Sequence, residues 1–245
     1  MPKYFLGVMI ILFFSSCKKV TDNFSPPSLS DYYPLQEGKY ITYNLDSTVF
    51  INFGQKEVVN HYQAQDRIDK EITDNLGRAA FRISRFIRKD STQDWAPNNT
   101  FMVVATSNSI EFIENNLRFI KLSSPLRQDF SWKGNSLIDS YSLLNDVRYL
   151  DDWDYVYENV GQPLTINNII FDSTITVSER DEFVGQDPGI PGTQYAEKTY
   201  SVEKYAKGIG LIYREFMHWE YQGPQNSTPG YFAGYGIKMS ITDHN

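Results

Sequence analysis

The sequence is poor in the side chains on which most enzyme and metal chemistry depends. Its 245 residues include one cysteine, Cys17, and three histidines. A single cysteine excludes intramolecular disulfides and CxxC zinc clusters, so stability has to come from a packed core. The sequence also lacks a GxSxG elbow, an SxxK pair and a paired-acid motif. It therefore assigns no catalytic residue and no cofactor, and it favours a non-catalytic protein without excluding an enzyme.

Long apolar runs are absent as well. The longest lies at the N-terminus, where Lys3 precedes about ten apolar residues, 5–14. This run is too short for the ~20 residues that cross a bilayer as a helix. A positive residue followed by a short apolar run is typical of an export signal. Ser15, Ser16 and Cys17 follow, where a secreted protein would carry a small-x-small cleavage site.

Two serines and a cysteine behind an apolar run resemble the lipobox of bacterial lipoproteins, in which the cysteine sulfur carries diacylglycerol. The resemblance implies a signal peptide over residues 1–16 and lipidation of Cys17 as the first mature residue. The thiolate is the nucleophile of that reaction. Two or more acyl chains anchor stably because each buried methylene contributes about 0.8 kcal/mol. The alternative is an ordinary cleaved signal with a free cysteine.

Basic residues are outnumbered by acidic ones. The chain has 23 Lys and Arg against 30 Asp and Glu, a net charge of −7, and removal of residues 1–16 takes away only Lys3. An acidic chain is a poor candidate for binding nucleic acid or an anionic membrane surface through charge. Residues 17–31 are polar, contain Pro26 and Pro27 and show no periodicity. They predict a lipidated tether before one β-rich domain over residues 32–245.

Apolar residues alternate with polar ones along much of this domain. The alternation is clearest over residues 39–53 and returns at 171–177 and 237–241. Further strand-like runs cover residues 79–88, 101–106, 110–114, 117–122, 195–205 and 211–221. Aromatic residues make up 15% of the chain and suit pleated surfaces, although they could also line a sugar or lipid pocket. Only residues 142–149 suggest a helical period.

Clusters of Gly, Pro, Asn and Asp separate these runs at residues 73–78, 96–100, 107–109, 185–192 and 222–230. About ten closely spaced strands joined by hairpins predict an all-β antiparallel meander. Such a sheet protects its edges by curling or by splitting into two layers. We expect a barrel or curved half-barrel, with a β-sandwich as the alternative.

Four segments carry a wider resemblance: YYPLQEGKY from residue 32, TDNLGR from residue 73, FSWKGN from residue 130 and YAKGIGLIYRE from residue 205. Together they resemble a family of uncharacterised lipoproteins from the Bacteroidota, which has no assigned activity. The resemblance implies an outer-membrane lipoprotein. Members exported to the cell surface tend to carry acids after the cysteine, so Lys18 and Lys19 favour the periplasmic face. Because an alternating run follows Gly208 and Gly210, they predict a turn or bulge before a strand rather than a phosphate loop.

The same resemblance implies possible O-glycosylation. Exported proteins of this group carry glycans at Asp-Ser/Thr followed by an aliphatic residue or threonine. Three DST triplets match, with their serines at Ser47, Ser91 and Ser173. The alternative is that short triplets of this kind arise by chance and suit strand ends.

Two residues near the C-terminus are weak pocket candidates. His218 would share a strand face with Glu220, and the two could bind a metal with His61, although a solvated face is the alternative and we expect no metal site. Glu215 lies on the opposite parity among apolar residues. That parity predicts an interior carboxylate, either in a salt bridge with an arginine of residues 78–88 or as a pocket acid.

Charged clusters elsewhere have simpler interpretations. Asp151, Asp152, Asp154 and Glu158 crowd together without the ligand spacing of an EF-hand, so an acidic loop or strand edge is favoured over calcium binding. The basic group comprises Arg82, Arg85, Arg88 and Lys89. It should pair with acids such as Glu111 and Glu114 rather than bind phosphate.

These observations favour a monomeric, lipid-anchored and non-catalytic binding or envelope-assembly module, attached to the outer membrane. A lipid or a glycan is the expected ligand class, by analogy with other envelope lipoproteins. The alternative is a tethered, glycan-directed hydrolase that uses Glu215, Asp151 or Asp154 as acid or base.

Overall fold

The structure is a computed structural model that describes residues 27–142 and 146–245. Cys17, the expected signal peptide and most of the expected tether lie outside these residues. No helix in the described part of the chain has the length and apolar character needed to cross a membrane.

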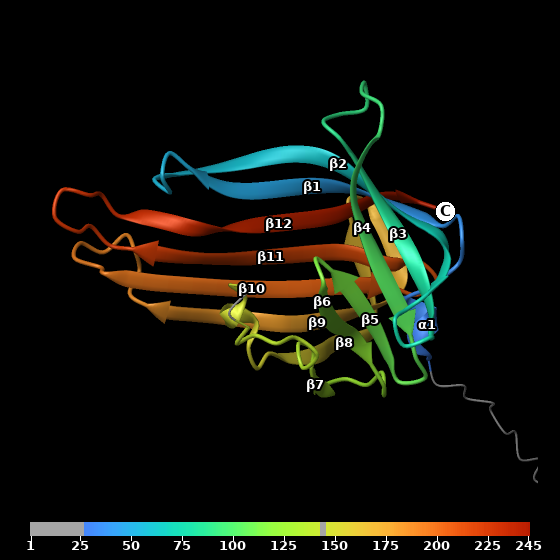
Figure 1. The fold of residues 1–245 in the computed structure, drawn as a ribbon. Helices are drawn as coiled ribbons and strands as arrows, with labels where there is room; N and C mark the ends of the chain where they lie inside the picture. The colour runs from blue at the N-terminus through green and yellow to red at the C-terminus, as the bar shows by residue number, and fades with distance from the viewer. Residues whose placement is uncertain (1–26, 143–145) are drawn as a thin grey trace, which may run out of the picture.

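One antiparallel sheet of twelve strands makes up the fold (Figure 1). The strands are β1 (Tyr40–Ile51), β2 (Lys56–Thr73), β3 (Ala79–Arg88), β4 (Ala96–Ala105), β5 (Ser109–Glu114), β6 (Leu117–Ser123), β7 (Ser131–Lys133), β8 (Asp154–Ile166), β9 (Ile169–Gly185), β10 (Tyr195–Ala206), β11 (Gly210–Gln222) and β12 (Tyr231–His244). A short helix, α1 (Leu29–Tyr32), precedes them, and a 3₁₀ turn, η1 (Arg148–Leu150), precedes β8. The expected all-β meander is confirmed.

Two meanders meet at the centre of this sheet. The strand order is β6-β5-β4-β3-β2-β1-β12-β11-β10-β9-β8-β7, so every neighbour follows in sequence except β1 and β12. These two strands pair over most of their length, with Leu45 opposite Met239 and Ser47 opposite Ile237. The first and last strands therefore join the N-terminal and C-terminal halves.

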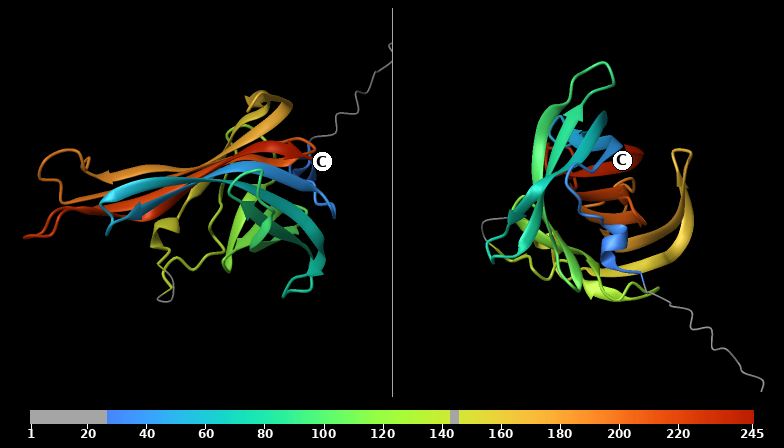
Figure 2. Two further views of the ribbon diagram at one scale, coloured as in Figure 1. Left: turned by 90° about the horizontal axis from the view of Figure 1, so that it is seen from above. Right: turned by 90° about the vertical axis from the view of Figure 1, so that its right-hand side faces the viewer.

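The sheet curls until its two edge strands meet, which Figure 2 shows end-on in its right-hand view. The Ile120 amide of β6 donates to the Gly134 carbonyl just after β7, at 2.7 Å, and the Trp132 indole N–H of β7 donates back to the Ile120 carbonyl at 2.7 Å. These bonds satisfy edge groups that would otherwise stay open. The sheet is thus a nearly closed barrel, and the expected barrel is favoured over the sandwich.

The long strands β1, β2 and β9 to β12 continue beyond the barrel as a flatter extension, on the left of Figure 1. Aromatic side chains hold this extension together: Phe50 stacks on Phe232 at 5.4 Å between ring centroids, and Trp219 meets Phe232 edge-on at 5.3 Å. Phe53, expected to continue the first strand, lies in the β1–β2 turn with positive φ and is 95% exposed.

The strand predictions are confirmed where alternation is strong and wrong where it is weak. Residues 79–88 form β3 as expected, whereas β2, the longest strand, was not predicted. Its inward positions mix Tyr62 and Ile68 with the small Ala64 and the charged Asp66, so no continuous apolar stripe marks it. Residues 96–100, expected to be a turn, begin β4, with Pro97 opposite Phe86. Within the described part of residues 142–149 only the η1 turn is helical.

Packed structure begins at Ser28, inside the range expected to be tether. The Ser28 amide donates to the Asp31 carboxylate at 3.1 Å, and Leu29 and Tyr32 of α1 join the core inside the barrel. The Gly208 amide in the β10–β11 turn donates to the Asp31 carbonyl at 2.6 Å. Gly208 has a φ of +78° in this turn, which confirms the predicted turn before a strand. Helix α1, with which the described part of the chain begins, is thus fixed against one end of the barrel (Figure 1).

Candidate functional site

The barrel contains a cavity of about 440 Å³. Trp153, Tyr155 and Lys121 are buried at its inner end, whereas Asn98 and Asn115 are exposed at its rim. Twelve of its 22 lining residues are aliphatic or aromatic, five are charged and five are Asn or Ser. The volume lies within the ~300–1,000 Å³ range of small-molecule sites, and the mixture of an apolar wall with few polar groups is typical of them.

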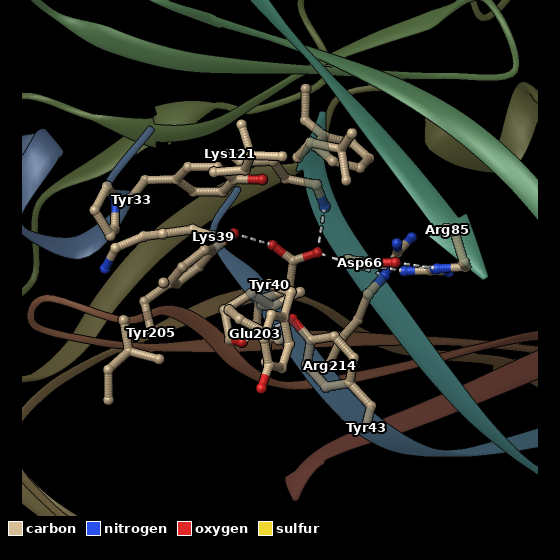
Figure 3. A pocket seen from close by; sticks show the side chains of 18 of the residues that line it. Tyr33, Lys39, Tyr40, Tyr43, Asp66, Arg85, Lys121, Glu203, Tyr205 and Arg214 are labelled. Carbon is tan, nitrogen blue, oxygen red and sulfur yellow. Dashed lines mark hydrogen bonds and ion pairs between the residues drawn. The ribbon is translucent and has the colours of Figure 1, made fainter. Parts of the chain in front are cut away.

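Charged side chains form a layer inside the barrel at the border of this cavity, which we call the charged layer: Asp66, Arg85, Lys121, Glu179, Glu203 and Arg214. Figure 3 shows all of them except Glu179, around a second cavity. This second cavity, of about 60 Å³, lies on the other side of the charged layer and is bordered by Tyr33 and Tyr205. Arg85, Lys121 and Arg214 line both cavities. The charged layer therefore divides the interior into a large compartment that reaches solvent and a small one next to α1.

Lys121 of β6 is the centre of the charged layer. Its Nζ lies 2.8 Å from Glu179 Oε1 of β9 and 2.8 Å from Glu203 Oε1 of β10. All three residues are at most 5% exposed. Ser201 Oγ donates to Glu179 at 2.5 Å, and the Tyr205 hydroxyl donates to Glu203. A buried lysine with two carboxylates and added hydroxyl donors is a well-satisfied ion group.

The two carboxylates of this group have shifted pKa values of opposite sign. Burial, strengthened by the neighbouring charge of Glu203, raises the pKa of Glu179 above its ordinary value. Burial also acts to raise the pKa of Glu203, but the charges of Lys121 and Arg214 outweigh it and the net pKa is lowered. Glu203 is therefore the anion of the pair, and Glu179 is the acid that takes up a proton first.

The two interior arginines differ in how well they are paired. The guanidinium of Arg85 on β3 donates two hydrogen bonds to the Asp66 carboxylate on β2, from Nε at 2.6 Å and from Nη2 at 2.7 Å. It also lies over the Phe101 ring. Arg214 of β11 has weaker partners. Its two terminal nitrogens both reach one oxygen of Glu114, at 3.3 Å each.

The Arg214 Nε has no hydrogen-bond partner, the one such buried side-chain nitrogen or oxygen in the described part of the chain. Its nearest acid oxygen, Glu203 Oε1, is 3.5 Å away.

His218 and Glu215 lie on the faces opposite to those expected. His218 is 7% exposed: its Nδ1 is 2.9 Å from Thr199 Oγ1, and its ring stacks on Tyr149 at 3.8 Å. Burial lowers the pKa of His218. The expected solvated face is therefore wrong for this residue. Glu215 accepts a hydrogen bond from the Tyr213 hydroxyl and lines none of the cavities described above, so the expected interior salt bridge is also wrong. The pairing of β10 with β11 has a bulge opposite Lys204 and Tyr205, so the alternation of inward and outward side chains along β11 shifts by one residue near Leu211.

The other candidate residues do not converge on one site. His61 binds Asp46 at 2.7 Å on the exposed part of β1 and β2. Asp151 accepts hydrogen bonds from Ser140 and Tyr141. Within residues 27–142 and 146–245, no three His, Cys, Asp or Glu side chains are grouped so as to hold a metal ion.

The acidic cluster before β8 and the basic group of β3 are engaged in ion pairs. Lys133 joins Asp152 at 2.7 Å and Asp154 at 2.9 Å, all of them well exposed. The basic side chains of β3 pair across to β2 rather than to the acids named from sequence: Arg82 with Asp69, Arg85 with Asp66 and Arg88 with Gln63. Glu111 pairs instead with Arg78 and Arg118, and Glu114 with Arg214.

The three candidate glycosylation serines differ in accessibility. Ser91 is exposed between β3 and β4. Ser47 lines the large cavity, and the Ser173 hydroxyl is hydrogen-bonded to that of Tyr32 at 2.9 Å. Glycosylation therefore stays a prediction, and Ser91 is the site at which it would disturb the fold least.

No protein-family model matches this chain, and no curated protein matches it either. A solved structure of a Bacteroides fragilis protein, described as exported and as having a YmcC-like fold, is similar over 86% of this chain and 99% of that one. The two share 11% sequence identity, with a TM-score of 0.37. A similarity of this size carries no argument about function, which has to come from the cavity itself.

The sequence interpretation missed the buried charged layer. Lys121, Glu179 and Glu203 belong to the interior faces of three strands, yet each was passed over as an ordinary polar position. A signal was present: Glu179 shares its parity with Ile175 and Val177, and Glu203 shares its parity with Tyr205. A charged residue in the apolar phase of a strand predicts a buried ion pair.

Proposed function

We propose that this chain is a lipid-anchored envelope protein that binds a small, largely apolar molecule inside its barrel and performs no catalysis. The observation that carries the proposal is the cavity of about 440 Å³, with apolar walls, a buried polar inner end and an exposed rim. Protein interiors are normally close-packed, and an open volume of this size with convergent polar groups is the usual mark of a ligand site.

The arrangement of the acids favours binding over hydrolysis. A glycoside hydrolase needs two carboxyl groups on one cleft, about 5 to 9.5 Å apart. Glu179 lines the large cavity and Glu203 the small one, with Lys121 between them. The acids suggested by the sequence are also separated, since Glu215 contacts Tyr213 while Asp154 holds Lys133. Glu114, the other acid that lines the large cavity, is held by Arg214 as Glu179 is held by Lys121.

The proposed anchor is diacylglycerol on Cys17, at the periplasmic face of the outer membrane. Residues 17–27 separate that cysteine from the packed structure, and a chain of this length reaches at most about 36 Å. The net acidic charge leaves the acyl chains as the membrane contact, and we expect a monomer without nucleic acid partners. Labelling the source cells with radioactive palmitate should mark the chain but not a Cys17→Ala variant. Equal label in both would refute the anchor.

The binding proposal can be tested with the full chain released from membranes. Native mass spectrometry should show a small molecule retained by the protein. An apolar fluorescent dye that displaces this molecule should bind to the protein saturably. Ile237→Trp, on the cavity wall, should remove both signals, while Leu76→Trp, at the exposed β2–β3 turn, should leave them intact. Absence of both signals in the wild-type chain would refute the proposal.

A further inference from the structure

The charged layer holds three cations, and only one of them lacks close partners. Lys121 has two carboxylate oxygens at 2.8 Å, and Arg85 has two at 2.6 and 2.7 Å. These distances are typical of charge-assisted hydrogen bonds, at about 2.7–2.9 Å. Arg214, in the same interior, makes two longer contacts of 3.3 Å to Glu114 Oε2, and its Nε lies 3.5 Å from Glu203 Oε1 without a hydrogen bond.

This deficit is large for a buried guanidinium. The group carries five N–H donors in a planar fork and never loses its charge. Leaving buried donors unsatisfied is costly, so native interiors rarely do it unless a ligand or another group completes the set. Arg214 borders the large cavity, and its side chain is 12% exposed, so a molecule in that cavity can reach its fork.

Glu114 is suited to give way to such a molecule. It is the last residue of β5, next to the Asn115–Asn116 turn, whose two residues have positive φ. Asn115 is exposed at the cavity rim, and the Glu114 side chain is 17% exposed. The carboxylate therefore has a short path to solvent, unlike Glu203, which is held by Lys121 and Tyr205 (Figure 3).

We infer that the cavity binds an amphiphile with an anionic head group, a carboxylate or a phosphate monoester, which replaces Glu114 on Arg214. Two oxygens of the head group match the planar fork, and the apolar part lies against Leu117, Phe119 and Ile237. Glu114 is thus an internal stand-in for the head group, held at a longer distance than a tight ion pair. This inference rests on the proposed ligand-binding function and adds the head-group chemistry and the residues that select it.

The test compares four probes with the same dodecyl chain length, each below its solubility limit and any micelle concentration: dodecanoate, dodecyl phosphate, dodecanol and dodecyltrimethylammonium. Binding to the full chain is followed by tryptophan fluorescence, for which Trp153 at the cavity floor is a natural reporter. The anionic probes should bind roughly tenfold or more tightly than dodecanol, the effect of a charge-assisted hydrogen bond. A preference for one anion over the other would identify which head group the cavity accepts.

Variants separate the role of Arg214 from a general effect of charge. Arg214→Lys keeps a cation but loses the fork, so the preference for anionic over neutral probes should fall by about tenfold. Glu114→Gln leaves Arg214 intact and removes its competitor, so dodecanoate should bind several-fold more tightly. Arg82→Gln removes an arginine that is paired with Asp69 away from the cavity, and it should change nothing.

The possible results distinguish the inference from the function on which it rests. Equal binding of dodecanoate and dodecanol would overturn the anionic head group while leaving a general apolar binding site. Failure of Glu114→Gln to strengthen dodecanoate binding would overturn the exchange at Arg214, even if the Arg214 variant does not fold. Failure of all four probes to bind would overturn both this inference and the proposed function.

Discussion

Replacement of Lys121 by methionine tests whether the charged layer is one buried ion group. Methionine keeps the length and removes the charge, so Glu179 and Glu203 would face each other without their common cation. Their oxygens lie no more than about 5.6 Å apart, because each is 2.8 Å from the same nitrogen. At an effective dielectric constant of about 20, two charges at that distance repel by about 3 kcal/mol. We expect a total loss of about 3–5 kcal/mol in unfolding free energy at pH 8, as for other buried pairs that lose one partner.

The loss should depend on pH. Lys121 lowers the pKa of Glu179, which burial already raises, so its removal raises that pKa further. An acid with a raised pKa in the folded state contributes stability at low pH that disappears as pH rises through the folded pKa. The cost of Lys121→Met should therefore be smaller at pH 5 than at pH 8. Adding Glu179→Gln, which removes one of the two charges, should restore part of the stability at pH 8.

The assay is urea unfolding at the two pH values, with the free energy extrapolated linearly to water. Lys133→Met is the matched control, because Lys133 also joins two carboxylates, Asp152 and Asp154, but on the surface. Exposed ion pairs contribute little, so this variant should leave the unfolding midpoint unchanged. Three results would refute the reasoning. The first is a loss of less than about 1 kcal/mol for Lys121→Met at pH 8. The others are the same loss at pH 5 as at pH 8, and an equal loss for Lys133→Met.

Three further predictions concern Gly234, His218 and Trp132. Gly234→Ala should lower the stability of the protein by more than about 2 kcal/mol in thermal unfolding, since φ is +142° and the new Cβ would lie 2.2 Å from the His218 carbonyl oxygen. Gly77→Ala is the control: φ is +76° there but the new Cβ meets no atom, so the loss of stability should be smaller. Burial lowers the pKa of His218, so wild-type stability should fall as pH drops below its ordinary 6.5, and His218→Gln should flatten that fall. Trp132→Phe removes the indole bond to Ile120, so β6 amides should exchange hydrogen faster without global unfolding.

The sequence predicts this fold well because strand periodicity is a local property. Residues 39–53 alternate clearly, residues 79–88 form a strand-like run, and the glycine-containing turns at 73–78 and 207–209 connect neighbouring strands as expected. The barrel also follows from general physics, since a long meander must protect its edges. Strand β2 was missed because Ala64 and Asp66 interrupt its inward apolar positions, and it pairs with both β1 and β3.

The cavity chemistry was not predictable in the same way. Which face of β11 points inward depends on the bulge opposite Lys204 and Tyr205, and that irregularity reverses the expected roles of Glu215 and His218. Pairing between Lys121 and Glu179 joins residues 58 positions apart on strands that are not neighbours in the sheet. Such contacts depend on the curvature of the barrel, which no single strand encodes.

The pairing of β1 with β12 has a consequence for how the protein reaches its folded state. Tyr43 and Ile241 are partners across nearly the whole domain, so the pairing of β1 with β12 cannot form until the last strand has been synthesised. Contacts between residues this distant in sequence slow folding. Until then, the two halves of the sheet each expose an unpaired edge strand, which must not pair with a strand of a neighbouring chain. Loss of the final strand would thus split the sheet through its middle rather than shorten one side.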